Sequence, residues 1–371
     1  MATTLKPFAF LLILLAGGCV DPYRPPEIAE PGSYLVVNGY FNSTPGTTTT
    51  IQLARTQNLA DKKAPVSETK AQVSIESKSK AIYALREGAG GAYTLTGVTP
   101  QAGETYRLHI KTARGGNYYS EYVPVIPTPP IDSLSWRVEN DGVQINVNTH
   151  DPKNNSRYYR WDFESAWEYT VPYFSTLEIK ANQIIDRQQN VFRCWGSENS
   201  TNIMTFSTTR LSKDVVSQFP ITFIPGRSVK LSAKYSILVK QIALSQPGFD
   251  YYDQLGKITQ NIGSIFDPQP AQIMGNIQSP TNPNDLVIGF FRVGTTETKR
   301  IFIRSSQLPN WPNLLSASSC IIDTLTQSDV LKFQPTILTY DFELKKYYTT
   351  SIDCADCRTK GGVIQRPVFW E

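Results

Sequence analysis

Short segments of alternating apolar and polar residues dominate the first third of the chain. In the segment TYRLHIK (105–111), Tyr106, Leu108 and Ile110 occupy every second position and alternate with basic side chains. A period of two with one apolar face predicts a half-buried β-strand. Turn-forming residues, glycine above all, separate these segments. We therefore predict an immunoglobulin-like or prealbumin-like β-sandwich over residues 33–126.

A proline-rich stretch, PVIPTPPID, ends this first region. Because proline cannot donate to the hydrogen-bond ladder of a sheet, we place a linker at residues 127–132. Alternating segments resume beyond it, and we predict a second, larger β-sandwich domain over residues 133–371. One inserted amphipathic helix is expected at 248–266, where apolar side chains recur every three or four positions. The last part of the domain is loop-rich and should be clamped by disulfides.

An aromatic run, RYYRWDFESAWEYTVPYF, follows early in the second domain. Its alternation places Trp161 and Phe163 on one face, and such a pattern is typical of side chains that fill the core of a sandwich. Trp167, Tyr169 and Tyr173 lie beyond the alternating part. We expect these three aromatic residues at the surface, as candidates for contact with a ligand.

The N-terminus, MATTLKPFAFLLILLAGGCV, has the form of a bacterial export signal, with a basic start, an apolar middle and small residues before a cysteine. The apolar part is too short for a membrane-spanning helix, which takes about 20 residues. Leu15-Ala16-Gly17-Gly18-Cys19 resembles the lipobox of bacterial lipoproteins. We expect residues 1–18 to be removed, Cys19 to be lipidated, and residues 19–32 to form a Pro-rich tether. A plain secretory signal with an incidental cysteine is the alternative.

Composition and motifs narrow the functional classes. The net charge is only +4 and no Lys/Arg-rich run occurs, which argues against nucleic-acid binding. The chain has two histidines, His109 and His150, and lacks the Gly-x-Ser-x-Gly, HExxH, P-loop and dinucleotide motifs. The Asn-rich loop at 150–156 lacks the ligand spacing of a calcium loop. We therefore expect a protein that is not an enzyme, with no catalytic residue, no cofactor and no metal site.

Four cysteines remain besides Cys19, and they are Cys194, Cys320, Cys354 and Cys357. An even number in an exported chain predicts two disulfides, for which three pairings exist. A four-cysteine zinc site and a redox Cys-x-x-Cys are the alternatives. Zinc thiolates favour reducing compartments, and the sequence after Cys357 is a poor helix former, so nothing there would activate a redox thiol.

Several stretches together resemble one family. They are the lipobox followed by Asp-Pro, YLVVNG (34–39), YYRW (158–161), Cys194-Trp195, GSIFDPQPAQIMGNI (263–277) with Gly-Phe-Phe at 289–291, and the tail CADCRTKGGVIQRPVFWE (354–371). The chain resembles the Bacteroidetes outer-membrane lipoproteins catalogued as a domain of unknown function. Genes of that family commonly lie beside those of TonB-dependent outer-membrane receptors. The resemblance assigns no catalytic residue.

The resemblance and the anchor together imply a non-enzymatic lipoprotein of the outer membrane that faces the cell exterior. It would be accessory to a TonB-dependent receptor in the capture or uptake of a ligand that the sequence does not identify. An adhesin or glycan-binding surface module without a transporter is the first alternative. A glycan-degrading enzyme is the second.

Two expectations concern the C-terminal half. The block at 263–291 is the candidate interface, with the residues Phe266, Asp267, Pro268, Gln269, Pro270 and Asn276; a structural plug that covers a sheet edge is its alternative. In the tail, we expect Cys354 and Cys357 to bond to Cys194 and Cys320 rather than to each other. Phe369 and Trp370 should pack against the body.

Overall fold

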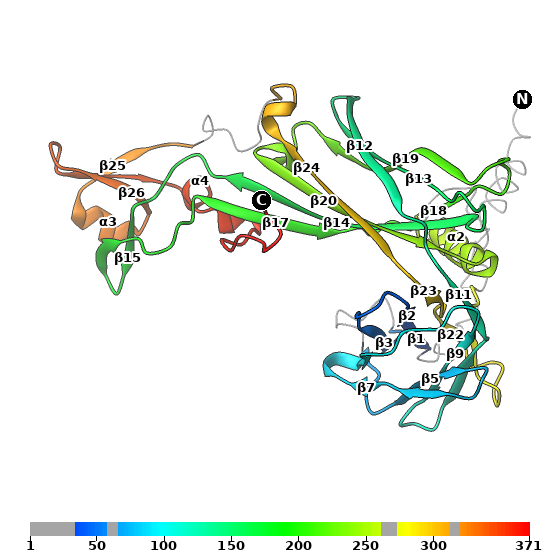
Figure 1. Ribbon diagram of the computed structural model, residues 1–371. Coiled ribbons are helices and arrows are strands. Elements are labelled where there is room, and N and C mark those ends of the chain that lie inside the picture. Colours follow the sequence, from blue (N-terminus) through cyan, green and yellow to red (C-terminus); the bar gives the residue numbers. More distant parts are fainter. Residues whose placement is uncertain (1–33, 58–65, 261–272, 312–319) are drawn as a thin grey trace, which may run out of the picture.

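The computed structural model describes residues 34–57, 66–260, 273–311 and 320–371. The fold is mainly β, as the alternating segments predicted. Figure 1 shows two β-sandwiches and a smaller group of strands and short helices. The smaller group continues the second sandwich, at the end of the molecule that lies away from the first sandwich. We call this group the distal module and define it as residues 171–192 and 320–361. Among the described helices, none combines the length and apolarity that crossing a bilayer would require.

The first sandwich is built mostly from the N-terminal segments, and its two sheets have the strand orders β22-β1-β3-β8-β7 and β2-β23-β11-β9-β10-β21. Tyr106, Leu108 and Ile110 are fully buried between them, because the period of two points all three toward the opposite sheet. The strands are β1 (Leu35–Gly39), β2 (Phe41–Asn42), β3 (Thr49–Arg55), β4 (Val66–Ser67), β5 (Gln72–Ser77), β6 (Ile82–Ala84), β7 (Arg86–Glu87), β8 (Ala92–Leu95), β9 (Thr105–Lys111), β10 (Asn117–Ser120) and β11 (Val123–Ile126).

A segment far along the chain completes this sandwich. Strands β21 (Ile277–Gln278), β22 (Val287–Ile288) and β23 (Val293–Gly294) pair with β10, with β1, and with β2 and β11, respectively. Phe291 and Val293 contribute to the apolar core of the first sandwich. Residues 277–294, which the sequence-based division assigns to the second domain, therefore add strands to the sheets of the first.

The second sandwich has a three-stranded sheet, in the order β12-β13-β19, packed on a sheet in the order β17-β14-β20-β24 with β18 beside β14. Trp161 is fully buried between them, stacks on Phe219 with ring centroids 4.6 Å apart, and donates its indole N–H to Gln241 Oε1 at 2.9 Å. Phe163 is partly buried against the same core. The strands are β12 (Ile131–Glu139), β13 (Gly142–His150), β14 (Tyr158–Thr170), β17 (Arg193–Asn199), β18 (Met204–Ser207), β19 (Val215–Pro225), β20 (Lys234–Ala243) and β24 (Glu297–Arg304).

One long helix, α2 (Gln246–Gln260), packs on β14 and β18. It starts two residues before the predicted helix because Ser245 caps it: the Ser245 hydroxyl accepts the N–H of Gly248 at 3.3 Å. Pro247 is tolerated in this first turn, where backbone N–H groups have no intrahelical partner. The predicted continuation to residue 266 lies outside the described residues.

Two chain segments cross side by side between the sandwiches. The N–H of Thr128 donates to Thr295 Oγ1, and the Thr128 hydroxyl donates to the Thr295 carbonyl, both at 2.8 Å. The Thr128 hydroxyl also accepts the N–H of Ala243 at 3.0 Å. These contacts, together with the return of residues 277–294, fix the two sandwiches against each other.

The distal module has little apolar core and two covalent cross-links. The bond Cys194–Cys357 ties it to β17 of the second sandwich, and Cys320–Cys354 closes it internally. Cys354 and Cys357 thus each bond to a distant cysteine, which is the arrangement that we expected. Its elements are β15 (Leu177–Lys180), β16 (Gln183–Asp186), β25 (Asp323–Leu325), β26 (Thr336–Asp341), β27 (Lys346–Thr350), α3 (Gln327–Phe333) and α4 (Ile352–Ala355).

The C-terminal tail lies on the second sandwich. Trp370 is buried and donates its indole N–H to Glu168 Oε2 at 3.0 Å. Phe369 is 42% exposed, and the Arg300 guanidinium lies 3.7 Å from its ring centroid. The tail therefore packs against the body, with Trp370 more deeply enclosed than Phe369.

Candidate binding surfaces

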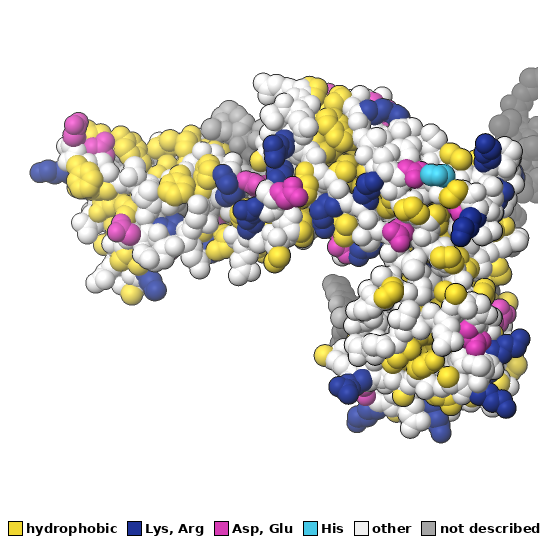
Figure 2. All heavy atoms as spheres, in the orientation of Figure 1, with side chains coloured by type: hydrophobic (Ala, Val, Ile, Leu, Met, Phe, Trp, Pro, Cys, Tyr) yellow, Lys and Arg dark blue, Asp and Glu magenta, His cyan; other side chains and the backbone are white. Residues whose placement is uncertain are grey.

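Exposed apolar side chains gather on the distal module. Figure 2 shows them spread over the left end of the molecule. The large exposed ones are Phe174, Ile321, Ile322, Phe333, Phe342, Leu344 and Ile352. Exposed apolar groups that are concentrated in this way make the module a candidate interaction surface.

Phe342 and Leu344 stand at the turn between β26 and β27. Asp341 Oδ1 accepts the N–H groups of Glu343 and Leu344, both at 2.9 Å. These backbone hydrogen bonds, the one from Leu344 first, lower the pKa of the Asp341 carboxyl. Phe342 is 84% exposed, and its ring meets the ring of Tyr340 edge-on at 5.0 Å. The turn thus presents two apolar side chains on a backbone whose shape is already set.

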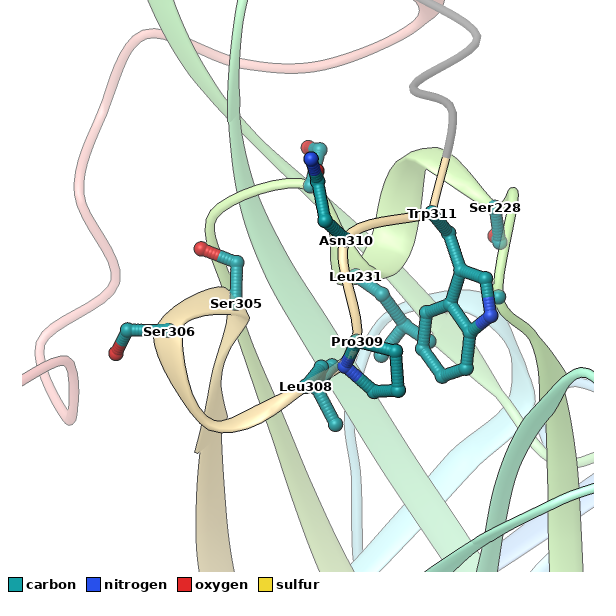
Figure 3. A pocket seen from close by; sticks show the side chains of 10 residues that line it. Ser228, Leu231, Ser305, Ser306, Leu308, Pro309, Asn310 and Trp311 are labelled. Carbon is teal, nitrogen blue, oxygen red and sulfur yellow. The ribbon is translucent and has the colours of Figure 1, made fainter.

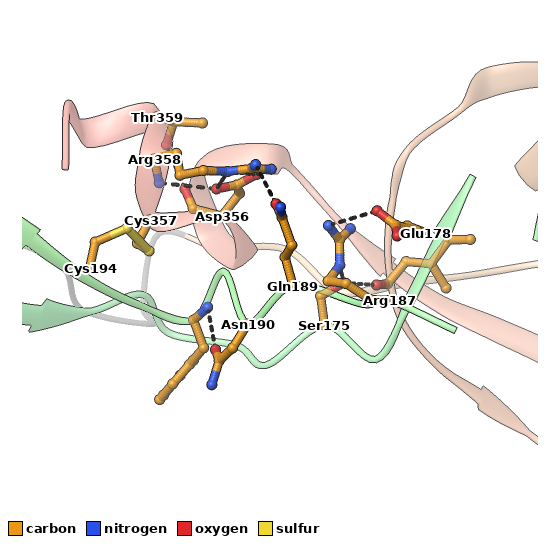
Figure 4. Close-up of polar contacts among 12 residues, drawn as sticks. Ser175, Glu178, Arg187, Gln189, Asn190, Cys194, Asp356, Cys357, Arg358 and Thr359 are labelled. Atoms are coloured by element: carbon orange, nitrogen blue, oxygen red, sulfur yellow. Dashed lines mark hydrogen bonds and ion pairs between the residues drawn. A yellow bond between two sulfur atoms is a disulfide. The ribbon is translucent and has the colours of Figure 1, made fainter. Parts of the chain in front are cut away.

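A polar network supports the module from within (Figure 4). Asp356 is buried and accepts hydrogen bonds from the Arg358 guanidinium, with Nη2 to Oδ2 at 2.6 Å. Burial would raise the pKa of Asp356, but the hydrogen bonds from Arg358 outweigh it and hold the pKa below its usual range. Arg187 donates to the Ser175 hydroxyl at 3.0 Å and pairs with Glu178 at 3.5 Å. These contacts lie next to the Cys194–Cys357 bond and stiffen the attachment of the module.

A cavity of about 460 Å³ opens at the far end of β24 (Figure 3). Trp311 forms one side of it, lies against Gly226 and donates to Asp141 Oδ1 at 3.0 Å. Two of the hydroxyl groups that line it serve the neighbouring backbone, because Ser228 accepts the N–H of Lys230 and Ser232 donates to a carbonyl. These two hydroxyl groups therefore hold the loop that lines the cavity.

Of the three aromatic residues expected at the surface, Tyr169 is buried and the other two, Trp167 and Tyr173, are partly exposed. Tyr169 is 1% exposed and donates its hydroxyl to the Cys357 carbonyl at 2.8 Å, so the prediction that it faces a ligand is wrong. The reason is that the alternation of β14 continues to residue 169, and the disulfide-bonded segment covers its far end. Trp167 and Tyr173 are half-buried. The ammonium group of Lys230 lies 5.1 Å from the Trp167 ring centroid.

The candidate interface block is described only in part. Asn276 is 5% exposed, and its side-chain amide exchanges two hydrogen bonds of 2.8 Å with the backbone of Phe291. Asn276 is therefore not an interface residue. Its side-chain amide pairs with the backbone of Phe291 as a neighbouring strand would, and so holds the returning segment in place. Residues Phe266 to Pro270 and Cys19 lie outside the described residues.

The polar residues that we weighed for chemistry make hydrogen bonds within the fold. His109 contacts Glu76 Oε1 at 3.1 Å and Asn117 Oδ1 at 2.8 Å, and His150 contacts Asp132 Oδ2 at 2.7 Å. Asp151 accepts three backbone N–H groups of its own loop, which makes it a turn cap. The described part of the chain contains no group of three or more His, Cys, Asp or Glu side chains placed to hold a metal ion.

Sequence reasoning missed the exposed turn of the distal module. The segment YDFELKKYY (340–348) carries a signal that could have been used. Tyr340, Phe342 and Leu344 keep the period of a strand, but the alternation ends at Lys345 and Lys346, and aspartate is a residue type that favours a turn. In a turn at this place, Phe342 and Leu344 lie outside the core.

Several solved structures share a limited likeness with this chain, whereas no curated protein matches its sequence. A proposed carbohydrate-binding protein from Bacteroides uniformis is 10% identical, with a TM-score of 0.16 over 58% of this chain and 91% of that one. The adhesin InvE of Yersinia pseudotuberculosis is 16% identical, with a TM-score of 0.15 over 57% and 55%. Chitinase ChiA74 from Bacillus thuringiensis is 12% identical, with a TM-score of 0.16 over 55% and 29%. TM-scores this low support no functional assignment.

A family model gives a firmer result. It matches residues 20–300, which include the first sandwich, the returning segment and most of the second sandwich. The distal module contributes only its first part, residues 171–192, to the matched region. The chain belongs to the family described as Domain of unknown function (DUF4249).

Proposed function

We propose that the protein is a lipid-anchored, non-enzymatic protein of the outer membrane that faces the cell exterior. In this role it binds a TonB-dependent receptor and assists the capture or uptake of a ligand. Cys19 carries the lipid, and the Pro-rich residues 20–32 separate the folded body from the membrane.

The observation that carries this proposal is the difference between the two ends of the elongated body. The tether leads into the first sandwich at residue 34, whereas the exposed apolar side chains of the distal module lie at the other end (Figures 1 and 2). A protein held at one end and apolar at the other is suited to reach a partner that rises from the same membrane. Phe342 and Leu344 would be the anchor residues of that contact.

The cross-links support an exported protein. All four cysteines in the described part of the chain are paired in disulfides, and such bonds persist in oxidising compartments. The hydrogen bonds between Thr128 and Thr295 also support the proposal, because they tie together the two chain segments that join the first sandwich to the second.

Affinity purification of the tagged full-length protein from mild detergent tests the partnership. We expect a TonB-dependent receptor to co-purify in stoichiometric amount. The double variant Phe342→Ala, Leu344→Ala should recover about tenfold less receptor or lower, since both side chains would be buried in the contact. Ile82→Ala, which changes an exposed apolar residue of the first sandwich, is the matched control and should recover as much as the wild type.

Recovery of no receptor with the wild type would contradict the proposal and favour an adhesin or glycan-binding module that acts alone. Receptor bound equally by the double variant would move the contact away from the distal module.

Mass spectrometry of the mature protein tests the anchor separately. We expect a chain that begins at Cys19 and carries a diacylglyceryl group. A chain that is cut elsewhere, or an unmodified Cys19, would remove the anchor from the account.

A further inference from the structure

A cleft of about 600 Å³ opens on the side of the second sandwich. One wall is formed by the last part of β19, and the other by the end of β17 and the loop after it. Strands β19 and β17 are edge strands of the two sheets of the sandwich. We propose that this cleft binds a neutral oligosaccharide. This inference rests on the proposed capture function, because it names the class of ligand that would be captured. Binding of the oligosaccharide itself requires neither the lipid anchor nor the receptor.

Unengaged polar groups line the loop wall. The side chains of Asn199, Thr201 and Asn202 make no hydrogen bond to any residue that the structure describes. Each amide offers both donors and an acceptor, and each sugar hydroxyl also donates and accepts. Across the cleft, Gln144 donates to the carbonyls of Ile145 and Thr222 at 2.9 and 3.2 Å, which fixes the opposite wall. Hydroxyl-rich ligands therefore match the groups that remain.

The cleft carries no uncompensated charge. Glu198 is its one charged lining residue, and Glu198 Oε1 pairs with the Lys230 ammonium and accepts the Ser165 hydroxyl at 3.1 Å. A cationic ligand would find this carboxylate already paired, and an anionic ligand would find no unpaired cation among the lining residues. Glycosidic cleavage commonly uses two carboxyl groups. Since Glu198 is alone among the lining residues, the cleft suits binding of a neutral glycan without cleavage.

Two phenyl rings supply the apolar surface. Both line the cleft: Phe163 is half-buried, and Phe223 is 40% exposed. The Phe223 ring lies against Gly142, where a Cβ atom would come within 2.4 Å of its Cζ. The absence of a side chain at residue 142 thus lets the ring rest on the backbone of β13. An aromatic ring held in place in this way can pack against the C–H face of a pyranose.

A peptide strand fits this edge poorly. Pro220 and Pro225 lack the N–H that strand addition requires. The pairing of β19 with β13 also shifts register twice, and Gln218 has a φ of 51°. Such an irregular edge offers no continuous row of backbone groups. The side chains of the cleft, rather than its backbone, are the groups available for recognition.

The test is a screen of the full-length protein in mild detergent against immobilised short oligosaccharides of glucose, mannose, galactose, xylose and N-acetylglucosamine, with uronic-acid oligosaccharides alongside. The strongest binder is then titrated by calorimetry. We expect a neutral oligosaccharide to bind, and Phe223→Ala and Asn202→Ala each to weaken its affinity by about tenfold or more. Ile82→Ala, which changes an exposed apolar residue of the first sandwich outside the cleft, is the control and should bind as the wild type does.

Three results would overturn the proposal: no binder among the neutral sugars, a preference for the uronic acids, or cleft variants that bind like the wild type. Melting temperatures check that the variants are folded, as expected for exposed positions. Receptor recovery with Phe223→Ala separates the two proposals. If Phe223→Ala recovers as much receptor as the wild type but has lost sugar binding, both proposals are supported. If the wild type binds sugar but recovers no receptor, only the partnership with the receptor is contradicted.

Discussion

The second sandwich and the distal module are stabilised in different ways although β14 ends where the module begins. The sandwich buries a broad apolar core between two sheets, centred on Trp161 and Val239. The cluster at the base of the module consists of Tyr169, Val171 and the bonded pair Cys194 and Cys357. A module that buries so little apolar surface depends on cross-links, as small extracellular domains do. It can consequently keep apolar residues such as Phe342 at its surface, since they are not needed to form a core.

Removing the bond between module and sandwich should have the largest effect. The Cys194–Cys357 bond spans 163 residues and Cys320–Cys354 spans 34. The chain-entropy relation gives a loss of about 5 kcal/mol for the first and about 4 kcal/mol for the second. In Cys194→Ala, Cys357→Ala, hydrogen exchange should rise throughout the module while the core strands of the second sandwich stay protected. A module that keeps its protection without this bond would contradict the comparison.

Trp161→Ala should destabilise the second sandwich rather than the distal module. It empties a large part of the sandwich core and leaves Gln241 Oε1 without its indole partner, so we expect the free energy of unfolding to fall by about 3–5 kcal/mol. Urea denaturation followed by tryptophan fluorescence and far-UV circular dichroism measures the loss. Phe342→Ala is the matched control and should change the same quantity by less than about 0.5 kcal/mol. Equal losses from both variants would remove the distinction between core and surface.

Asn276→Ala should give a smaller and local effect. It leaves the backbone N–H and carbonyl of Phe291 without their partner, at a cost of about 1–3 kcal/mol. Faster hydrogen exchange in residues 277–294, with the distal module unchanged, is the expected result. Exchange that stays as slow as in the wild type would mean that other contacts hold the returning segment.

Acid should weaken the module more than the sandwich, and this effect is the smallest. Because the pKa of Asp356 is lowered in the folded protein, its contribution to stability is complete above the unfolded pKa of about 3.9 and is lost as pH falls through the folded value. Exchange in residues 352–360 should therefore rise below about pH 4. Asp356→Asn should already be weakened at neutral pH and should lose this pH dependence. A variant with the same pH dependence as the wild type would place the titrating group elsewhere.

The sequence predicted those parts of the fold that depend on local periodicity. The alternation through Tyr159 and Trp161 identified the sandwich core, and the even number of cysteines besides Cys19 indicated two disulfides. The return of residues 277–294 was not predicted, because strands of two residues are too short to show a period. Tyr169 was misplaced because the segment that buries it is 188 residues away in the sequence.

The candidate surfaces were harder to predict than the fold. Exposed apolar residues such as Phe342 look like core residues in a sequence, and only the turn built on Asp341 shows that they point outward. The cleft unites side chains of β13, of β14, of β19, and of the end of β17 with the loop that follows it. No local pattern connects these four segments, so their meeting could be known only from the structure.

Photo-crosslinking in living cells tests the central claim most directly. A photoreactive phenylalanine analogue is placed at position 342 of the distal module and, as the matched control, at exposed position 82 of the first sandwich. The account predicts a crosslink from position 342 to a TonB-dependent receptor and none from position 82. A receptor crosslink from position 82 alone, or no receptor crosslink from either position, would contradict it.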